Sequence, residues 1–267
     1  MWSVMITNPE EGHTSGPYEA LWYIVPYYEQ IRDYLRGKVD LTYLYKSEAV
    51  RDRVWSRLRE KKHVYFVGVG HGGDDVFTGY RLDEIFWVDM EGEGWSHYWT
   101  RDSVLLMLSC LTAARLGPWM DEKDCWTYIG WSEEFAFYVN IGKRKGADWI
   151  ETPERLWFDP IEEAFSKCAA AEITPGECYE HIKRKYEDHI TNPEIPERWR
   201  SILEHDLRCM RLLGRVEHPP RVTPPVPPPP PVPIPAPELI AAVSGVVAGI
   251  VVGIGFREWE KRGYRIL

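Results

Sequence analysis

The sequence predicts an α/β protein with a mostly parallel central sheet, followed by a proline-rich linker and one transmembrane helix. Short apolar segments rich in β-branched and aromatic residues alternate with helical patterns over residues 1–215. Such alternation is typical of βαβ units, whose strands lie parallel. Beyond them, a segment dominated by proline precedes a long run without any charge.

The expected strands are short and hydrophobic. The third and fourth are almost continuously apolar, which is typical of central strands that are covered on both faces. Between these two strands, residues 77–100 are expected to form a β-hairpin excursion. The five expected strands span residues 2–7, 39–45, 64–69, 104–108 and 126–130.

Helical patterns fill the intervals. Residues 18–35 predict a helix interrupted at Pro26, because proline lacks the N–H that the helix needs. A second helix is expected over residues 47–62, with Ser47 as its N-cap. Its apolar face comprises Val50, Val54 and Leu58, and later helices are expected over 162–172 and 178–189.

Composition excludes several classes of protein. Forty-one acidic residues against 32 basic ones give a net charge of −9, the wrong sign for gripping a nucleic acid backbone. The five cysteines form no CxxC pair and no zinc-finger spacing, so we expect no metal site and no cofactor. An odd number of cysteines fits either five free thiols or one free thiol with up to two disulfides, so it does not decide between a reducing and an oxidising compartment. The N-terminus lacks the pattern of a secretory signal.

The C-terminal part is expected to form a stalk and a membrane anchor. Residues 216–238 hold more than half of the 21 prolines and predict a polyproline II spacer, or alternatively a PxxP ligand for an SH3-like groove. Residues 239–256 are uncharged and long enough to span a bilayer as a helix, the alternative being a buried core helix. Residues 257–267 form a short basic tail.

Two features of this anchor bear on assembly and topology. Gly245, Gly249 and Gly253 recur every four residues, which favours close packing of two such helices and a homo-oligomer. The basic tail favours a cytoplasmic C-terminus with the globular part outside. The missing signal peptide favours the opposite, tail-anchored topology, so the side of the membrane stays open.

Residues that could perform chemistry follow the two most hydrophobic strands. The third expected strand leads into His71, Gly72 and Gly73, and the fourth leads into Ser109 and Cys110. Ligands bind beyond the carboxyl ends of strands in an open parallel sheet. If the two strands are neighbours, the imidazole and the thiol meet there as base and nucleophile.

The surroundings of the thiol suggest how it is activated. A neighbouring imidazolium, or the N-terminus of a helix expected at residues 111–115, would lower the pKa of Cys110. Gly72 and Gly73 allow the backbone to approach a substrate and to direct an N–H toward a developing oxyanion.

This arrangement resembles the caspase-like cysteine peptidases, the clan CD group that includes caspases, gingipains, clostripain, legumain and separase. The resemblance rests on a hydrophobic strand ending in His-Gly and, some forty residues later, one ending in Ser-Cys. The run CWTYIGWSEEFAF is similar to the strand after the nucleophile in gingipain-like and CHAT-type members. The resemblance to this family covers about residues 1–170 and implies that the protein folds as a three-layer sandwich.

The family implies roles for particular residues. Cys110 would be the nucleophile, His71 the proton shuttle, and the N–H groups of Gly72 and Cys110 the oxyanion hole. The strand after the nucleophile would supply part of the substrate pocket. Its end consists of Trp131, Ser132, Glu133 and Glu134, and a carboxylate there would favour a basic P1 residue.

Other interpretations stand beside these. A lone cysteine at a strand end is often an inert apolar residue, and the alternative for Glu133 or Glu134 is that it begins the next helix. Gly68, Gly70 and Gly73 spell a dinucleotide-binding GxGxxG, but two carboxylates and no helical pattern follow, which argues against NAD. The other side chains are interpreted as packing or disulfide cysteines (Cys125, Cys168, Cys178, Cys209) and structural or solvated histidines (His63, His97).

The sequence therefore predicts a membrane-anchored cysteine endopeptidase that acts on a peptide or protein substrate. The alternative from another class is a catalytically inactive recognition module on the same scaffold, tethered to a membrane.

Overall fold

The computed structural model describes residues 2–9, 19–61, 63–140, 150–219 and 264–266. Its centre is a six-stranded sheet with the strand order β2-β1-β3-β6-β7-β9. All neighbouring strands are parallel except the last pair, in which β9 runs antiparallel to β7. The prediction of an α/β protein with a mostly parallel sheet is confirmed. The strands are β1 (Ser3–Asn8), β2 (Asp40–Tyr45), β3 (Tyr65–Val69), β6 (Val104–Leu108), β7 (Thr127–Trp131) and β9 (Met210–Gly214).

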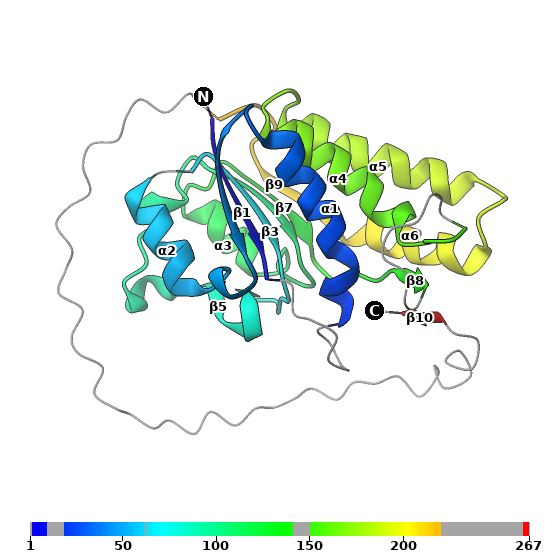
Figure 1. The fold of residues 1–267 in the computed structure, drawn as a ribbon, viewed down its shortest axis with the longest axis horizontal. Coiled ribbons are helices and arrows are strands. Elements are labelled where there is room, and N and C mark those ends of the chain that lie inside the picture. The colour runs from blue at the N-terminus through cyan, green and yellow to red at the C-terminus, as the bar shows by residue number, and fades with distance from the viewer. Residues whose placement is uncertain (1, 10–18, 62, 141–149, 220–263, 267) are drawn as a thin grey trace, which may run out of the picture.

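Helices cover both faces of this sheet, so the body has three layers (Figure 1). One face carries α1 (Glu19–Leu35), α4 (Arg155–Ala169), α5 (Pro175–Thr191) and α6 (Glu197–Cys209), and the other carries α2 (Arg51–Glu60) and α3 (Leu116–Glu122).

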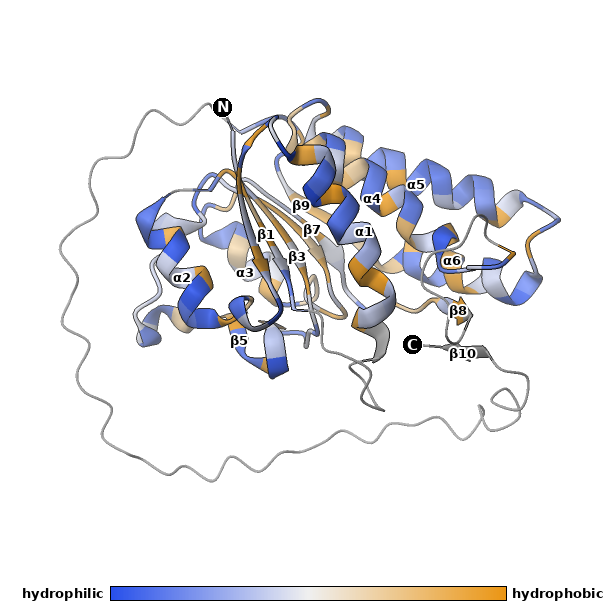
Figure 2. Ribbon diagram, viewed as in Figure 1, coloured by the Kyte–Doolittle hydropathy of each residue, from blue (hydrophilic) through white to orange (hydrophobic). Residues whose placement is uncertain are grey.

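Alternating residues of each strand point into the two helical layers. In β6, Leu106 packs with the α1 and α4 side, whereas Leu105 and Met107 pack with the α2 and α3 side. This is the expected geometry of a strand, in which successive side chains face opposite ways. Figure 2 shows the result as an apolar sheet between helices whose outer surfaces are hydrophilic.

The helix at the N-terminus differs from the prediction. α1 runs through Pro26 without a break, although proline cannot donate a helical hydrogen bond. The residues that follow, Tyr27, Tyr28 and Ile31, are almost completely buried, and the Tyr28 hydroxyl donates to the carbonyl of Gly68 at 3.1 Å. Packing of this face onto the sheet offsets the lost hydrogen bond.

The second helix begins later than predicted. A short 3₁₀ turn spans Lys46–Glu48, and α2 starts at Arg51 rather than at residue 47. The N-cap Val50 provides no side-chain cap. The carboxylate of Asp83 instead accepts the N–H of Arg51. The cap comes from a residue distant in the chain, so local sequence could not reveal it.

The expected hairpin excursion is present, and it is shorter than residues 77–100. β4 (Val76–Thr78) pairs antiparallel with β5 (Glu84–Trp87), and 3₁₀ turns follow at Met90–Glu93 and His97–Trp99. These segments bury aromatic side chains beneath the sheet, on the face that carries α2 and α3.

Several elements near the C-terminus were not anticipated. α6 leads directly into β9, which closes the edge of the sheet beside β7. β8 (Tyr138–Asn140) pairs antiparallel with β10 (Tyr264–Ile266). No helix within the described ranges is both long and apolar enough to cross a bilayer. Of the stalk expected at 216–238, residues 216–219 are described and lie against the body, where the N–H of Gly176 donates to the carbonyl of Val216 at 2.8 Å. The rest of the stalk and the expected anchor at 239–256, with its three glycines, lie outside the described ranges.

Candidate functional site

Strand register sets the two candidate catalytic residues at equivalent positions. β3 and β6 are parallel neighbours, and Val69 pairs with Leu108. His71 and Cys110 each follow two residues beyond that pair, at the carboxyl ends of central strands. The N–H of Gly70 still donates to the carbonyl of Leu108 at 3.4 Å, so the segments that follow β3 and β6 remain hydrogen-bonded to each other up to the site.

Gly72 brings the two loops into direct contact. A β carbon on Gly72 would overlap the hydroxyl of Ser109 and lie 2.5 Å from both the carbonyl oxygen of Cys110 and a methyl of Thr112. Atoms cannot approach this closely, so no larger residue fits without displacing one loop. The backbone that follows the histidine therefore packs onto the backbone that carries the cysteine.

Hydrogen bonds lock the same two loops further out. The carbonyl of Asp74 accepts the N–H groups of Arg115 and Leu116 at 3.0 and 2.8 Å. The guanidinium of Arg115 in turn pairs with the carboxylates of Asp74 and Asp75. The two acidic residues that argued against a phosphate site thus have a structural role at the start of α3.

The glycine motif has a structural explanation as well. After Gly73 the chain enters β4 rather than a helix, so the expectation against dinucleotide binding agrees with this local geometry. A β carbon on Gly70 would collide with the carbonyl of Thr78, and one on Gly68 would lie 2.8 Å from the ring of Phe66. Close packing explains these glycines.

Both candidate catalytic groups are held in their neutral forms. Cys110 is half-buried, and its thiol faces the carbonyl of Phe135 at 3.9 Å. Burial is the main reason that the pKa of Cys110 is raised, and burial also lowers the pKa of His71. The expected lowering of the thiol pKa is therefore not seen. No helix starts at residues 111–115, since Leu111 has a positive φ of 61° and α3 begins at Leu116.

The backbone N–H groups of Gly72 and Cys110 differ in their surroundings. Gly72 forms an isolated bridge with Phe77, but its hydrogen bonds run from Thr78 to His71 and from Gly73 to Val76. The N–H of Gly72 therefore points away from this bridge. Within the described part of the chain, the N–H of Gly72 donates to no backbone acceptor, whereas the N–H of Cys110 interacts with its own thiol and opposes the rise in the pKa of that thiol.

The segment after β7 lies beside the cysteine loop. The carbonyl of Glu133 accepts the N–H of Leu111 at 3.0 Å, and Ser132 donates through both its N–H and its hydroxyl to the carbonyl of Cys209. Trp131 is 0% exposed and packs edge-on against Phe135 at 4.9 Å. The expectation that Trp131 contacts substrate is not met, because its side chain belongs to the core.

The two glutamates at this strand end are exposed and differ in their surroundings. The Glu133 carboxylate lies 3.8 Å from Nδ1 of His205 on α6. The charge of Glu134 instead acts on Cys110, where it contributes to the raised pKa of the thiol. Of the two, Glu134 has the clearer electrostatic link to the site.

Asp206 on α6 is a neighbour of the site that sequence reasoning missed. It is 0% exposed, and its Oδ1 accepts the N–H of Ala136 at 3.1 Å. That N–H belongs to the peptide unit whose carbonyl, from Phe135, faces the Cys110 thiol. An aspartate within a polar amphipathic helix gave no signal for this contact.

None of the cysteines forms a disulfide. All five are free thiols, and every one except Cys110 is buried. The disulfide interpretation is therefore not supported, and the packing interpretation fits. The burial of the other four is consistent with Cys110 as the one thiol near solvent. These four are Cys125, Cys168, Cys178 and Cys209.

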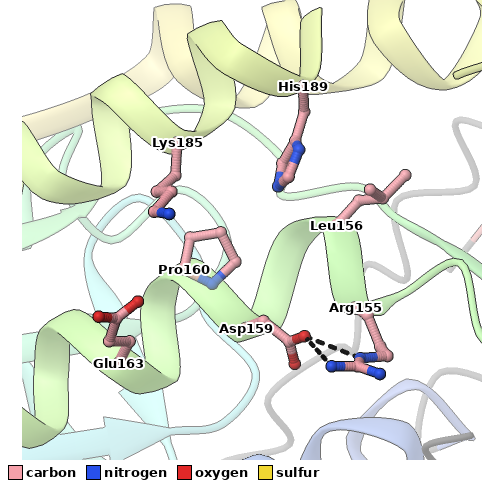
Figure 3. Close-up of a pocket in the computed structure, with 7 residues that line it drawn as sticks. All are labelled: Arg155, Leu156, Asp159, Pro160, Glu163, Lys185 and His189. Carbon is pink, nitrogen blue, oxygen red and sulfur yellow. Dashed lines mark hydrogen bonds and ion pairs between the residues drawn. The ribbon is translucent and has the colours of Figure 1, made fainter. Parts of the chain in front are cut away.

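A surface cavity lies away from this site, between α4 and α5 (Figure 3). Its volume is about 360 Å³, and its wall includes Arg155, Asp159 and His189. Arg155 and Asp159 neutralise each other through an ion pair of 2.7 Å. The cavity contains no cysteine or serine nucleophile among its lining residues.

Comparison with known proteins identifies the fold. No family model matches the chain, and no curated protein matches it. Among solved structures, the Arg-specific cysteine proteinase gingipain R is similar with a TM-score of 0.50 at 10% identity. The match covers 82% of this chain and 47% of the gingipain chain, so this chain spans about half of that protein's length. The likeness shows a caspase-like fold.

Proposed function

We propose that this chain is a cysteine peptidase in which Cys110 is the nucleophile and His71 the general base. The observation that carries the proposal is the packing of Gly72 against the backbone of Cys110, beyond two paired strands. It brings the histidine loop and the cysteine loop together at the edge where α/β sheets bind ligands. The caspase-like fold supports the same assignment.

The neutral state of both groups defines the first chemical step. As the Cys110 sulfur attacks the substrate carbonyl, the S–C bond forms and His71 takes the thiol proton. The carbonyl oxygen gains the negative charge, and the N–H groups of Gly72 and Cys110 stabilise it. The thiol has to turn away from the Phe135 carbonyl for this attack.

The remaining steps return the enzyme to its starting state. The C–N bond breaks as the imidazolium of His71 gives its proton to the leaving amine. Water then attacks the thioester, His71 accepts a proton from that water, and the S–C bond breaks to release the acid. The proton returns to the sulfur. No oxidant or cofactor enters this sequence.

We assign the specificity for a basic P1 residue to Glu134. Its carboxylate is exposed and acts on Cys110, whereas Glu133 faces His205. A charge-assisted bond to a P1 arginine or lysine contributes about 1.5–3 kcal/mol, which is about 13- to 160-fold in kcat/KM.

Fluorogenic peptides with Arg, Lys, Ala or Asp at P1 test these assignments. We expect hydrolysis to fall at least about 100-fold in both Cys110→Ala and His71→Ala. The buried thiol Cys125 provides a matched control, Cys125→Ala, that retains activity. Glu134→Gln should reduce the preference for Arg over Ala, and Glu133→Gln should leave it unchanged. A folded chain that hydrolyses none of the peptides would contradict the proposal and favour the inactive recognition module.

Membrane anchoring through residues 239–256 remains part of the proposal, and its support comes from the uncharged sequence alone. Val247→Arg places a charge within this segment, at a cost of about 2.5–3.5 kcal/mol for insertion. We expect the full chain to stay in membranes after an alkaline wash and this variant to be released. If residues 239–256 cross the bilayer once, β8 and β10 lie on opposite sides of it and cannot pair. Equal release of the native chain and of Val247→Arg would therefore favour the arrangement in which β8 and β10 pair and the segment does not cross.

The glycine stripe predicts self-association of the anchored chain. Gly249→Leu would place a bulky side chain on the face shared by Gly245 and Gly253. We expect crosslinked dimers in membranes for the native chain and fewer for this variant. Unchanged crosslinking would remove the glycines from the interface.

A further inference from the structure

We propose that the end of α6 forms a zinc-type metal site, with His205, Asp206 and Cys209 as ligands. One ligating atom from each side chain lies within 4.8 Å of those from the other two. The site adjoins the His71 and Cys110 pair, because Asp206 lies next to the Phe135–Ala136 peptide that faces the thiol, but it shares no ligand with that pair. The proposal holds whether or not the chain is a peptidase.

Helical spacing explains how these three side chains meet. Residues three and four apart share one face of a helix, so His205 and Asp206 both lie above Cys209. The helix ends at Cys209, and β9 begins at the next residue, Met210. Because the sheet fixes that strand, the position of the thiol is fixed as well.

Asp206 gives the independent sign that a ligand is missing. Its side chain is 0% exposed, and its Oδ2 accepts no hydrogen bond within the described part of the chain. The indole N–H of Trp157 interacts with this carboxyl and opposes the rise in its pKa, but the contact lies outside regular hydrogen-bond geometry. No described lysine, arginine or histidine forms an ion pair with it. A buried carboxylate with an open oxygen beside two other ligands is suited to a cation.

His205 is oriented as metal-binding histidines usually are. Its Nε2 lies 2.9 Å from the carbonyl of Glu134, which can only accept, so Nε2 carries the hydrogen. In the neutral tautomer that this contact selects, the lone pair lies on Nδ1. Metal ligands of this type typically donate their other N–H to a backbone carbonyl or a carboxylate.

Glu133 is placed to complete the coordination. Its Oε2 lies 3.8 Å from Nδ1 of His205, so two acceptors face each other with room for a cation between them. The ligands of a tetrahedral zinc site lie about 3.3–3.8 Å apart, given bonds of about 2.0–2.3 Å. Glu133 is exposed and can move toward the metal, and the ion can enter from this open side.

The chemistry of the ligands selects the metal. Cys209 is buried, and its thiol now donates to the carbonyl of Asp206 at 3.4 Å. On binding, the S–H bond of Cys209 breaks and the sulfur bonds to the metal. Because burial raises the pKa of Asp206, its carboxyl also gives up a proton, and both protons leave to solvent. Sulfur, imidazole and carboxylate together suit Zn²⁺, whereas Mg²⁺ and Ca²⁺ prefer oxygen ligands alone.

Cobalt and zinc titrations of the full chain, freed of metal, test the proposal. We expect one equivalent of Co²⁺ to give a thiolate-to-metal absorption band in the near ultraviolet and Zn²⁺ to abolish it. Zn²⁺ should also raise the unfolding temperature, because it binds the folded state. The absence of a thiolate band at saturating Co²⁺ would overturn the site.

Variants locate the metal. Cys209→Ser should remove the thiolate band, and Asp206→Asn should weaken binding at least about 10-fold. Glu133→Gln should also weaken metal binding. Because this substitution changes only an exposed side chain, the loss of metal affinity cannot come from misfolding. The matched controls Cys110→Ser and Cys168→Ser should keep the band. A band that survives in Cys209→Ser and is lost in Cys110→Ser would put the metal at the strand ends and refute the α6 site.

Discussion

The carbonyl oxygen of Cys110 lies 2.5 Å from the place that a β carbon would take on Gly72. This close approach brings together two loops that are far apart in the chain. It also makes the glycine a requirement of the packing, since its φ is not in the left-handed region.

Gly72→Ala should therefore separate the two loops. The methyl group would meet backbone atoms and the Ser109 hydroxyl, none of which can yield as a long side chain could. We expect a loss of about 1–3 kcal/mol in unfolding free energy and a larger proportional loss of peptidase activity. Gly92→Ala is the matched control, because nothing lies within 4 Å of its added methyl. Equal effects of the two substitutions would show that the loop contact is unimportant.

The raised pKa of Cys110 makes its titration informative. Since burial disfavours the thiolate, alkylation of Cys110 should speed up with rising pH and reach its midpoint above pH 9. Iodoacetamide labelling, followed by mass spectrometry from pH 6 to 10.5, measures this midpoint. His71→Ala should barely change it, because a neutral imidazole does not hold the thiolate. Rapid labelling in mild acid that depends on His71 would instead indicate a thiolate–imidazolium pair.

His63 should make the fold less stable in acid. It is 2% exposed, and burial lowers its pKa from 6.5 to about 4. The unfolded chain therefore binds a proton first as the pH falls, so the contribution of His63 is complete above pH 6.5 and is lost toward pH 4. The loss amounts to about 3 kcal/mol in unfolding free energy. Urea unfolding at several pH values should show this slope, and His63→Asn should flatten it.

Thr174 should stabilise α5 without affecting the candidate site. Its hydroxyl accepts the N–H of Glu177, and the Glu177 carboxylate accepts the N–H of Thr174, which forms a capping box. Thr174→Ala should cost about 1 kcal/mol in thermal or urea unfolding. Thr191→Ala, at the other end of the same helix, should cost less than about 0.5 kcal/mol. Peptidase activity should be unchanged in both variants.

Continuous hydrophobic patterns made the central strands predictable. The segments around Val67 and Leu106 could only be buried on both faces, and the polar residues after them then had to lie at one sheet edge. The hydrophobic pattern of the two strands therefore predicts that His71 and Cys110 lie at the carboxyl edge of the sheet. Their contact through Gly72 depends on strand order, which the pattern alone does not contain.

Long-range contacts account for what the sequence missed. Asp83 caps α2 from another part of the chain, and the tertiary packing of Tyr27 and Tyr28 carries α1 past Pro26. Asp206 is 70 positions from Ala136 in the chain, and only the fold brings its carboxylate to the N–H of that residue. Trp131 looked like a pocket residue because it ends a strand, although its side chain turns inward.

The pairing of β7 with β9 has a consequence for biosynthesis. Thr127 and Arg215, which the pairing holds together, are 88 positions apart in the chain. During translation β7 therefore leaves the ribosome before its partner β9. The N–H and C=O groups along that edge of β7 stay unpaired until β9 emerges. The carbonyl of Cys209, which fixes Ser132 beside the cysteine loop, arrives with the same late segment. A nascent chain stalled before α6 would thus expose an unpaired strand edge and an unsupported loop, making it a substrate for chaperones rather than an early form of the folded protein.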